Sequence, residues 1–200
     1  MIWGLLPRNK ESVTLWVDFG YLFAGSNLLN GVWIIVWVQN TDACVILAAI
    51  LLLTLLATVM LMITRAQTWS RDRPGGALEF AVVDVAFSIY GGWLTVAAAV
   101  NVTAALVACK WDGSPWTEEG WSVLMVCVAA AIFLAFTWRR RDGVYGLVYT
   151  WAVLAIASAN RGTSEAINDA SVAMAAIVGA ASLAMLVYRA GGAYRSKVSA

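Results

Sequence analysis

Residues 43–63 read ACVILAAILLLTLLATVMLMI, an apolar run without a charged side chain. A helix needs about 20 consecutive apolar residues to cross a bilayer core, which is the length of this run. Five further segments resemble it, and polar turns separate them. The polar stretch 160–169 ends in Asn168 and Asp169, either of which is placed to cap the last helix. We expect an all-α polytopic membrane helix bundle, a single transmembrane domain over residues 1–200, with helices at about 15–38, 43–63, 81–109, 121–138, 143–159 and 171–188.

The composition supports a membrane protein and excludes several other classes. The chain is 62% hydrophobic and 12% charged, whereas about a quarter of the residues in soluble domains are charged. Its net charge of +1 offers no basic surface for nucleic acid. The chain has no histidine, the commonest metal ligand and proton shuttle. No nucleophile–base pair, phosphate loop or metal cluster is evident. We therefore expect no enzymatic activity, no catalytic residue and no metal site.

Basic residues predict the orientation of the helices. Short loops rich in Lys and Arg stay on the cytoplasmic side of a membrane. The side opposite the termini has only Lys110 and Arg161. We expect a multi-pass protein with both termini on the cytoplasmic side, or its stromal or matrix equivalent, and the sequence does not indicate which membrane. The basic residues of the terminal side are Arg8, Lys10, Arg65, Arg71, Arg73, Arg139, Arg140, Arg141, Arg189, Arg195 and Lys197.

Polar and aromatic side chains inside the predicted helices are the candidate functional residues. Asn30 and Trp33 lie one turn apart in the first helix. Tyr90, Trp93 and Asn101 share a face of the third helix at helical spacing. An amide in lipid needs a hydrogen-bond partner. In one interpretation Asn30 and Asn101 bond to each other and only hold helices together. In the other, these faces line a ligand cavity between the first, third and fifth helices.

Two of these stretches carry a family resemblance. Residues 87–97, FSIYGGWLTVA, followed by Asn101, resemble the last core helix of the tryptophan-rich sensory protein/translocator protein family. Residues 26–33, SNLLNGVW, resemble the Leu-Asn-x-x-Trp helix of that family. Residues 111–113 and 139–151 resemble a distant, longer branch with extra C-terminal helices. Two features depart from the family pattern: its first two helices have no counterpart here, and Ala86 stands where a proline is expected.

The resemblance implies a function that the residues alone do not. It implies a membrane protein that binds a hydrophobic ligand, such as a tetrapyrrole, a sterol or another lipid, between its helices. Matching residue by residue, the implied cavity-lining positions are Asn30, Trp33, Tyr90, Trp93 and Asn101. No cofactor is indicated beyond such a tetrapyrrole or lipid, and the absence of histidine removes the commonest axial haem ligand.

Two other functions compete with ligand binding. A chain with short loops and no catalytic group also fits a structural or accessory subunit of a larger membrane complex. A small transporter is the third alternative, for which Gly91-Gly92 and Asp84 are the only indications. Expected partners are membrane lipids, a hydrophobic small molecule, and either other membrane subunits or a second copy of the chain in a homodimer.

Overall fold

The computed structural model describes residues 10–71 and 85–198. In this part of the chain all regular structure is helical, and six helices are long and apolar enough to span a membrane, which confirms the predicted fold class. The first residues of the predicted third helix, 81–84, lie outside the described ranges, as does Asp84. The helices are α1 (Lys10–Trp37), α2 (Asp42–Arg71), α4 (Ala86–Ala108), α5 (Glu118–Arg140), α6 (Gly143–Asn160) and α7 (Glu165–Val198).

Side-chain caps fix where the later helices begin. Thr117 accepts a hydrogen bond from the backbone N–H of Gly120 at 3.0 Å, which starts α5. The predicted cap of α7 is wrong, because Ser164 caps this helix by accepting from the N–H of Ile167 at 3.2 Å. Asn168 is already inside the helix, and its amide donates to the carbonyl oxygen of Ala157 at 3.2 Å.

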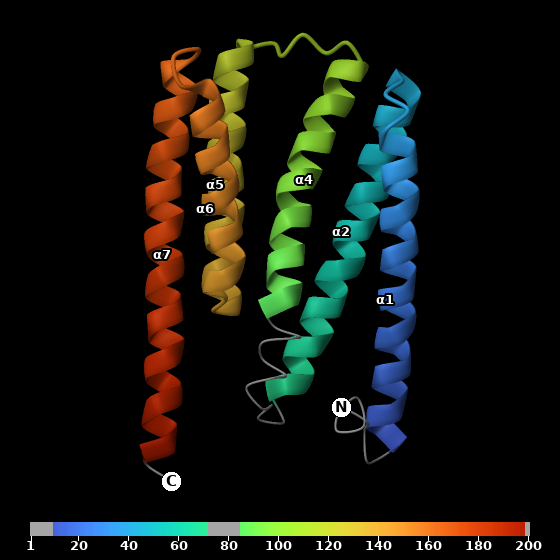
Figure 1. The fold of residues 1–200 in the computed structure, drawn as a ribbon, viewed down its shortest axis with the longest axis vertical. Helices are drawn as coiled ribbons and strands as arrows, with labels where there is room; N and C mark the ends of the chain where they lie inside the picture. The colour runs from blue at the N-terminus through green and yellow to red at the C-terminus, as the bar shows by residue number, and fades with distance from the viewer. Residues whose placement is uncertain (1–9, 72–84, 199–200) are drawn as a thin grey trace.

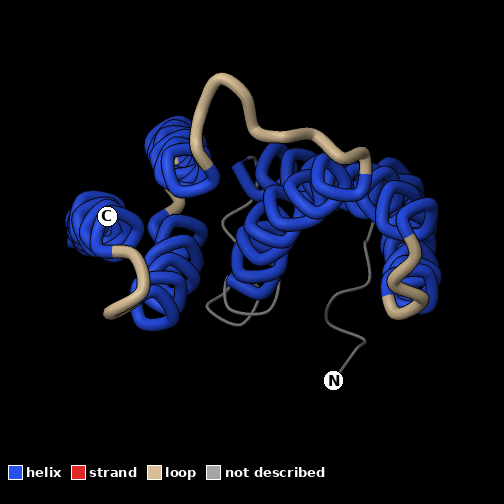
Figure 2. Tube along the Cα trace, turned by 90° about the horizontal axis from the view of Figure 1, so that it is seen from above, coloured by secondary structure: helices blue, strands red, loops and turns tan. Residues whose placement is uncertain are grey.

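The helices form two groups of three. α1, α2 and α4 pack on one another in sequence, and α5, α6 and α7 form a compact triad. The main contact between the groups is that of α4 with α6, while α4 and α5 touch only slightly. Figure 1 shows the start of α1 and the end of α7 at one end of the bundle, and Figure 2 shows the triad on one side of α4 with α1 and α2 on the other.

Small residues let the helices of the triad approach closely. A Cβ on Gly146 would lie 2.1 Å from Oγ of Ser182 on α7 and 2.6 Å from Oγ1 of Thr137 on α5. A methyl group here would displace both hydroxyl groups, so glycine allows the closest approach where the three helices meet. In a membrane, where lipid competes with apolar contacts, such close packing is a main source of helix association.

A glycine also lets α4 approach α6 closely, near the end of the bundle where α1 begins and α7 ends. A Cβ on Gly92 would lie 2.9 Å from Cβ of Val148 and 3.2 Å from the carbonyl oxygen of Tyr145. The hydroxyl groups of Thr95 and Tyr145 are 2.6 Å apart. Thr95 donates its proton to the carbonyl oxygen of Gly91 at 2.9 Å, so Tyr145 is the donor in this pair.

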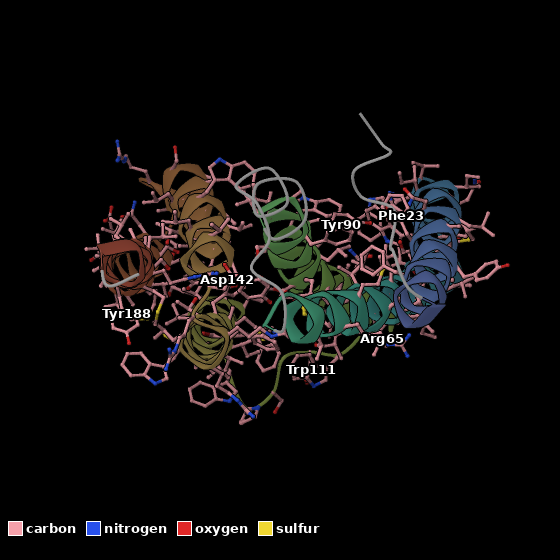
Figure 3. All side chains as sticks on the ribbon, turned by 90° about the horizontal axis from the view of Figure 1, so that it is seen from below. Phe23, Arg65, Tyr90, Trp111, Asp142 and Tyr188 are labelled. Carbon is pink, nitrogen blue, oxygen red and sulfur yellow. The ribbon has the colours of Figure 1, made fainter. Side chains whose placement is uncertain are left out.

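A second hydrogen bond joins the same two helices. The hydroxyl of Ser88 donates to Oδ2 of Asp142, and both side chains are buried. Oδ1 of Asp142 caps α6 by accepting from the N–H of Tyr145 at 3.2 Å. Seen from the terminal end, Asp142 lies inside the bundle, whereas Tyr188 lies on its outer side (Figure 3). We call the Ser88–Asp142 and Thr95–Tyr145 hydrogen bonds the latch.

Candidate functional site: a tryptophan groove

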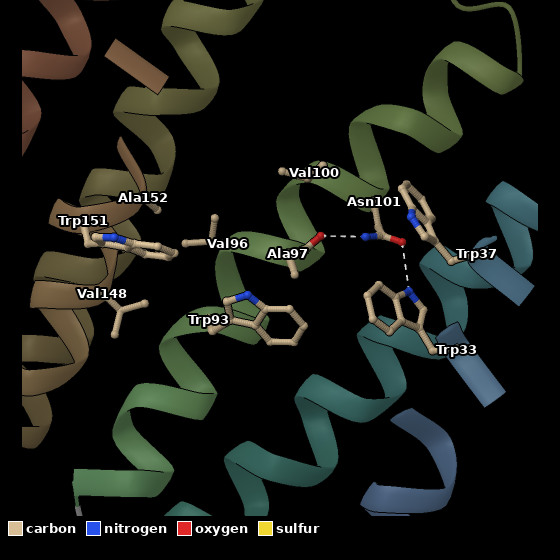
Figure 4. A pocket seen from close by; sticks show the side chains of 10 residues that line it. All are labelled: Trp33, Trp37, Trp93, Val96, Ala97, Val100, Asn101, Val148, Trp151 and Ala152. Atoms are coloured by element: carbon tan, nitrogen blue, oxygen red, sulfur yellow. Dashed lines mark hydrogen bonds between the residues drawn. The ribbon is translucent and has the colours of Figure 1, made fainter. Parts of the chain in front are cut away.

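An open groove lies between α1, α4 and α6, the three helices that the sequence indicated. Its volume is about 260 Å³, and its wall is almost entirely apolar. Figure 4 shows how the side chains from the three helices converge on it. The lining residues are Trp33 and Trp37 of α1, Trp93, Val96, Ala97, Val100 and Asn101 of α4, and Val148, Trp151 and Ala152 of α6.

Asn101 is the polar centre of this groove. It is 3% exposed, and its Oδ1 accepts a hydrogen bond from the indole Nε1 of Trp33 at 3.2 Å. Its Nδ2 donates to the carbonyl oxygen of Ala97, one turn earlier in α4, at 2.9 Å. The interaction therefore fixes the position of the Trp33 ring and ties α1 to α4 across the groove.

Asn30 does not have the partner expected from the sequence. Asn101 bonds to Trp33 and to Ala97 and not to Asn30, so the interpretation in which Asn30 and Asn101 bond to each other is wrong. Oδ1 of Asn30 is buried and has no hydrogen-bond partner among the described residues. Asn30 lies one turn before Trp33, just outside the groove wall.

Aromatic rings extend from the groove along α1 and α4. The ring of Trp93 meets that of Trp33 edge to face, with centroids 6.1 Å apart and an interplanar angle of 81°. Tyr90 stacks on Trp93 at 6.3 Å and 10°, and Trp37 stacks on Trp33 at 6.3 Å and 26°. Edge-to-face and stacked pairs at these distances are favourable. Tyr90 therefore packs against the ring of Trp93 and does not itself line the groove.

The structure adds two tryptophans to those that the sequence suggested. Trp37 lies one turn beyond Trp33, a spacing that could have placed it on the same face. Trp151 closes the groove from α6, and this residue is 67% exposed. The sequence places Trp151 inside the predicted helix 143–159, but its contact with the groove depends on how α6 packs against α4.

The chemistry of the groove is that of a binding site. No acidic or basic side chain lines it, and the hydrogen-bonding groups on its wall are the indoles and the amide of Asn101. Among the described residues no group of His, Cys, Asp or Glu could hold a metal ion. An occupant would be held by aromatic faces and aliphatic side chains. The second hydrogen on Nδ2 of Asn101 is the one amide donor left beside the bond to Ala97.

Comparison with known proteins identifies the family of this chain. The model of a family described as TSPO-like protein matches residues 1–189. This chain belongs to that family. No curated protein and no solved structure matches it. The TSPO-like match confirms the family resemblance of residues 26–33 and 87–101, and with the six apolar helices it makes the chain a multi-pass membrane protein.

Family membership does not decide which residues bind a ligand. Of the five candidates, Trp33, Trp93 and Asn101 line the groove, whereas Asn30 and Tyr90 lie next to lining residues. Their role in ligand binding stays a prediction.

Proposed function

We propose that this protein binds a flat hydrophobic ligand, most simply a tetrapyrrole, in the tryptophan groove. The observation that carries the proposal is the convergence of four indole rings from three helices on one apolar groove. Indole faces stack on flat conjugated molecules, and such pairs gain about 0.5–1.5 kcal/mol beyond the burial of their area. A flat conjugated ring system therefore fits this wall better than an alkyl chain.

The size of the groove suggests how the ligand is held. Small-molecule sites typically have volumes of about 300–1,000 Å³. The groove, at about 260 Å³, is smaller and open on one side. It would accept one edge of a tetrapyrrole while the remainder lies among lipid chains. Because the chain has no histidine, ring stacking and the amide of Asn101 would hold the ligand without an imidazole on a metal.

Tryptophan fluorescence in lipid nanodiscs tests the proposal. Titration with protoporphyrin IX should quench the fluorescence saturably. In Trp93→Leu, the loss of stacking and of buried area should weaken binding about tenfold, which corresponds to about 1.4 kcal/mol. Trp138→Leu is the matched control, because Trp138 is 77% exposed and does not line the groove.

The two variants separate specific binding from partitioning into the bilayer. Equal titration curves for Trp93→Leu and Trp138→Leu would refute a site at the groove. Quenching that never saturates would have the same meaning, since a porphyrin dissolved in lipid quenches every tryptophan at the surface. A second groove variant, Trp151→Leu, should weaken binding without touching the contact between α1 and α4.

We also propose that both termini face the cytoplasm. The support is the concentration of Lys and Arg in the segments at the terminal end of the bundle, compared with Lys110 and Arg161 at the other end. In a cysteine-free background, a membrane-impermeant maleimide added to intact cells should label Ser114→Cys and leave Ser196→Cys unlabelled. The reverse pattern would invert the assigned orientation.

A further inference from the structure

A second, larger cavity lies beside the tryptophan groove. This cleft, of about 460 Å³, is bounded by α4, α5 and α6, with Ile167 of α7 at one end. It uses the next face of α4, marked by Ala99 and Thr103, whereas Ala97 and Asn101 face the groove. Val96, Val100 and Ala152 line both cavities and form the wall between them. The cleft volume lies within the range of small-molecule sites.

The packing of the two helix groups explains why the cleft exists. The latch holds α4 against α6 near the end that carries the termini. At the same end, Nη2 of Arg140 on α5 donates to Oγ1 of Thr64 on α2 at 2.7 Å. Away from this end, α4 leans away from α5, and the loop of residues 109–117 crosses the resulting gap (Figure 1). The cleft occupies this diverging part of the bundle.

The hydroxyl groups on the cleft wall donate their protons to backbone carbonyl oxygens. Thr103 donates its hydroxyl proton to the carbonyl oxygen of Ala99 at 3.0 Å. Ser122 and Tyr149 donate to the carbonyl oxygens of Glu118 and Val126, at 2.9 and 2.8 Å. Each hydroxyl oxygen can still accept a hydrogen bond. These hydroxyl groups therefore offer acceptors, and not donors, to an occupant.

The remaining polar residues of the wall are Asn160 and Trp121. Nδ2 of Asn160 donates one hydrogen to the carbonyl oxygen of Ile156 at 2.9 Å, which leaves its second hydrogen as a donor and its Oδ1 as a further acceptor. The indole Nε1 of Trp121 has no hydrogen-bond partner in the described part of the chain, and because this atom is buried it offers no accessible donor to the cavity. Trp121 packs edge to face on Trp111 of the connecting loop, with centroids 4.7 Å apart.

The charged residues at this end of the bundle also favour a head group without negative charge. α5 begins with Glu118 and Glu119, one turn before the lining residues Trp121 and Ser122. The connecting loop carries Asp112 and Lys110, and Arg161 follows the lining residue Asn160, so acidic side chains outnumber basic ones here. An anionic head group would meet acceptors and carboxylates here. A head group that donates hydrogen bonds would meet partners of the right kind.

We propose that the cleft is a second binding site, for a single-chain amphiphile whose head group donates hydrogen bonds and carries no negative charge. The alkyl chain lies along Val100, Ala129 and Val153, between α4, α5 and α6. The head group lies toward Thr103, Ser122 and Asn160, where the free acceptors are. The site is separate from the tryptophan groove and does not depend on a ligand there.

Photo-crosslinking of the full chain in nanodiscs tests the proposal. The probes are three dodecyl compounds with a diazirine in the chain, an amine, an alcohol and a carboxylic acid, used at pH 9, where the amine is largely cationic and the acid anionic. Labelled peptides are then mapped by mass spectrometry. We expect the amine and the alcohol to label the cleft-facing residues of α5 and α6, and the acid to label them at least fivefold less.

Variants that fill the cleft provide the control. Ala129→Leu and Ala104→Leu project into it from opposite walls, and each should lower labelling at least fivefold. Ala131→Leu changes an exposed residue of α5 outside the cleft and should leave labelling unchanged. Thermal unfolding will establish whether each variant is folded. If one of the two cleft variants does not fold, the other is enough for the test.

Three results would overturn the proposal. One is labelling that falls equally in Ala131→Leu, or that spreads evenly over lipid-facing positions. Another is equal labelling by the acid and the amine. The third is loss of labelling in Trp93→Leu, which would mean one continuous site. Failure of porphyrin binding alone leaves the expected labelling intact, so the two proposals fail independently.

Discussion

Gly91 and Gly92 are adjacent residues of α4 that face different neighbours, and their alanine variants should behave differently. A Cβ on Gly92 would lie 2.9 Å from Cβ of Val148 and 3.2 Å from the backbone oxygen of Tyr145. Both atoms are fixed to the α6 backbone. A Cβ on Gly91 would lie 2.8 Å from Cδ1 of Ile63 and 3.0 Å from Cε of Met60, which are the ends of flexible side chains.

Two opposing effects determine how much each variant changes the free energy of unfolding. Ordinary contact begins at 3.4 Å, so Gly92→Ala must move α4 and α6 apart by about 0.5 Å, whereas a rotamer change suffices for Gly91→Ala. Overpacking of a rigid contact costs about 1–3 kcal/mol, and alanine in place of glycine in a helix gains about 1 kcal/mol. We expect Gly92→Ala to lower the free energy of unfolding by up to about 2 kcal/mol and Gly91→Ala to be neutral or stabilising by up to about 1 kcal/mol.

Unfolding by SDS in bicelles, followed by circular dichroism, measures both free energies. The difference between the variants matters more than either value, because both carry the same gain in helix propensity. Equal stability of the two variants would refute the close α4–α6 contact, and so would a greater loss in Gly91→Ala. The separation should also weaken the latch, so Gly92→Ala should expose backbone amides of α6 to hydrogen exchange.

Two further variants test individual hydrogen bonds by the same unfolding measurement. Asp142→Ala removes the cap of α6 and the acceptor of Ser88, and should lower the free energy of unfolding by about 2–4 kcal/mol. Asp142→Asn keeps a capping oxygen and should lower it by less than about half of that. Equal losses in the two variants would exclude the capping role. Trp33→Phe leaves the buried Oδ1 of Asn101 without its donor and should cost about 1–2 kcal/mol. Trp37→Phe, which keeps a ring beside Trp33, should cost less, and the opposite order would count against the hydrogen bond to Asn101.

The helices could be predicted from the sequence because the membrane requirement is local. A run such as residues 43–63 is long and apolar enough to span a bilayer whatever surrounds it, and the resulting helix α2 includes it entirely. The start of α7 was predicted less well, because Ser164 and Asn168 are both good capping residues. Only the course of the backbone decides which of them precedes the first turn.

The site could be predicted in part. The spacing within α1 and α4 placed Trp33, Trp93 and Asn101 on faces that the structure brings together. It could not select Trp33 over Asn30 as the partner of Asn101, because this choice depends on the rotation of α1 about its axis. The cleft lay beyond sequence reasoning for a similar reason. It arises from the angle between α4 and α5, and most of its wall consists of alanine, valine, isoleucine and methionine side chains that are typical of any membrane helix.

Val96, Val100 and Ala152 form a wall common to the groove and the cleft, so ligands bound in both cavities would be thermodynamically linked. Occupants of the two cavities would press on the same three side chains from opposite faces, and valine has little rotameric freedom in a helix with which to yield. Each occupant would then change the affinity of the other by the same factor, because coupling between two binding equilibria is reciprocal. A flat aromatic molecule in one cavity would in this way report on the amphiphiles of the surrounding bilayer.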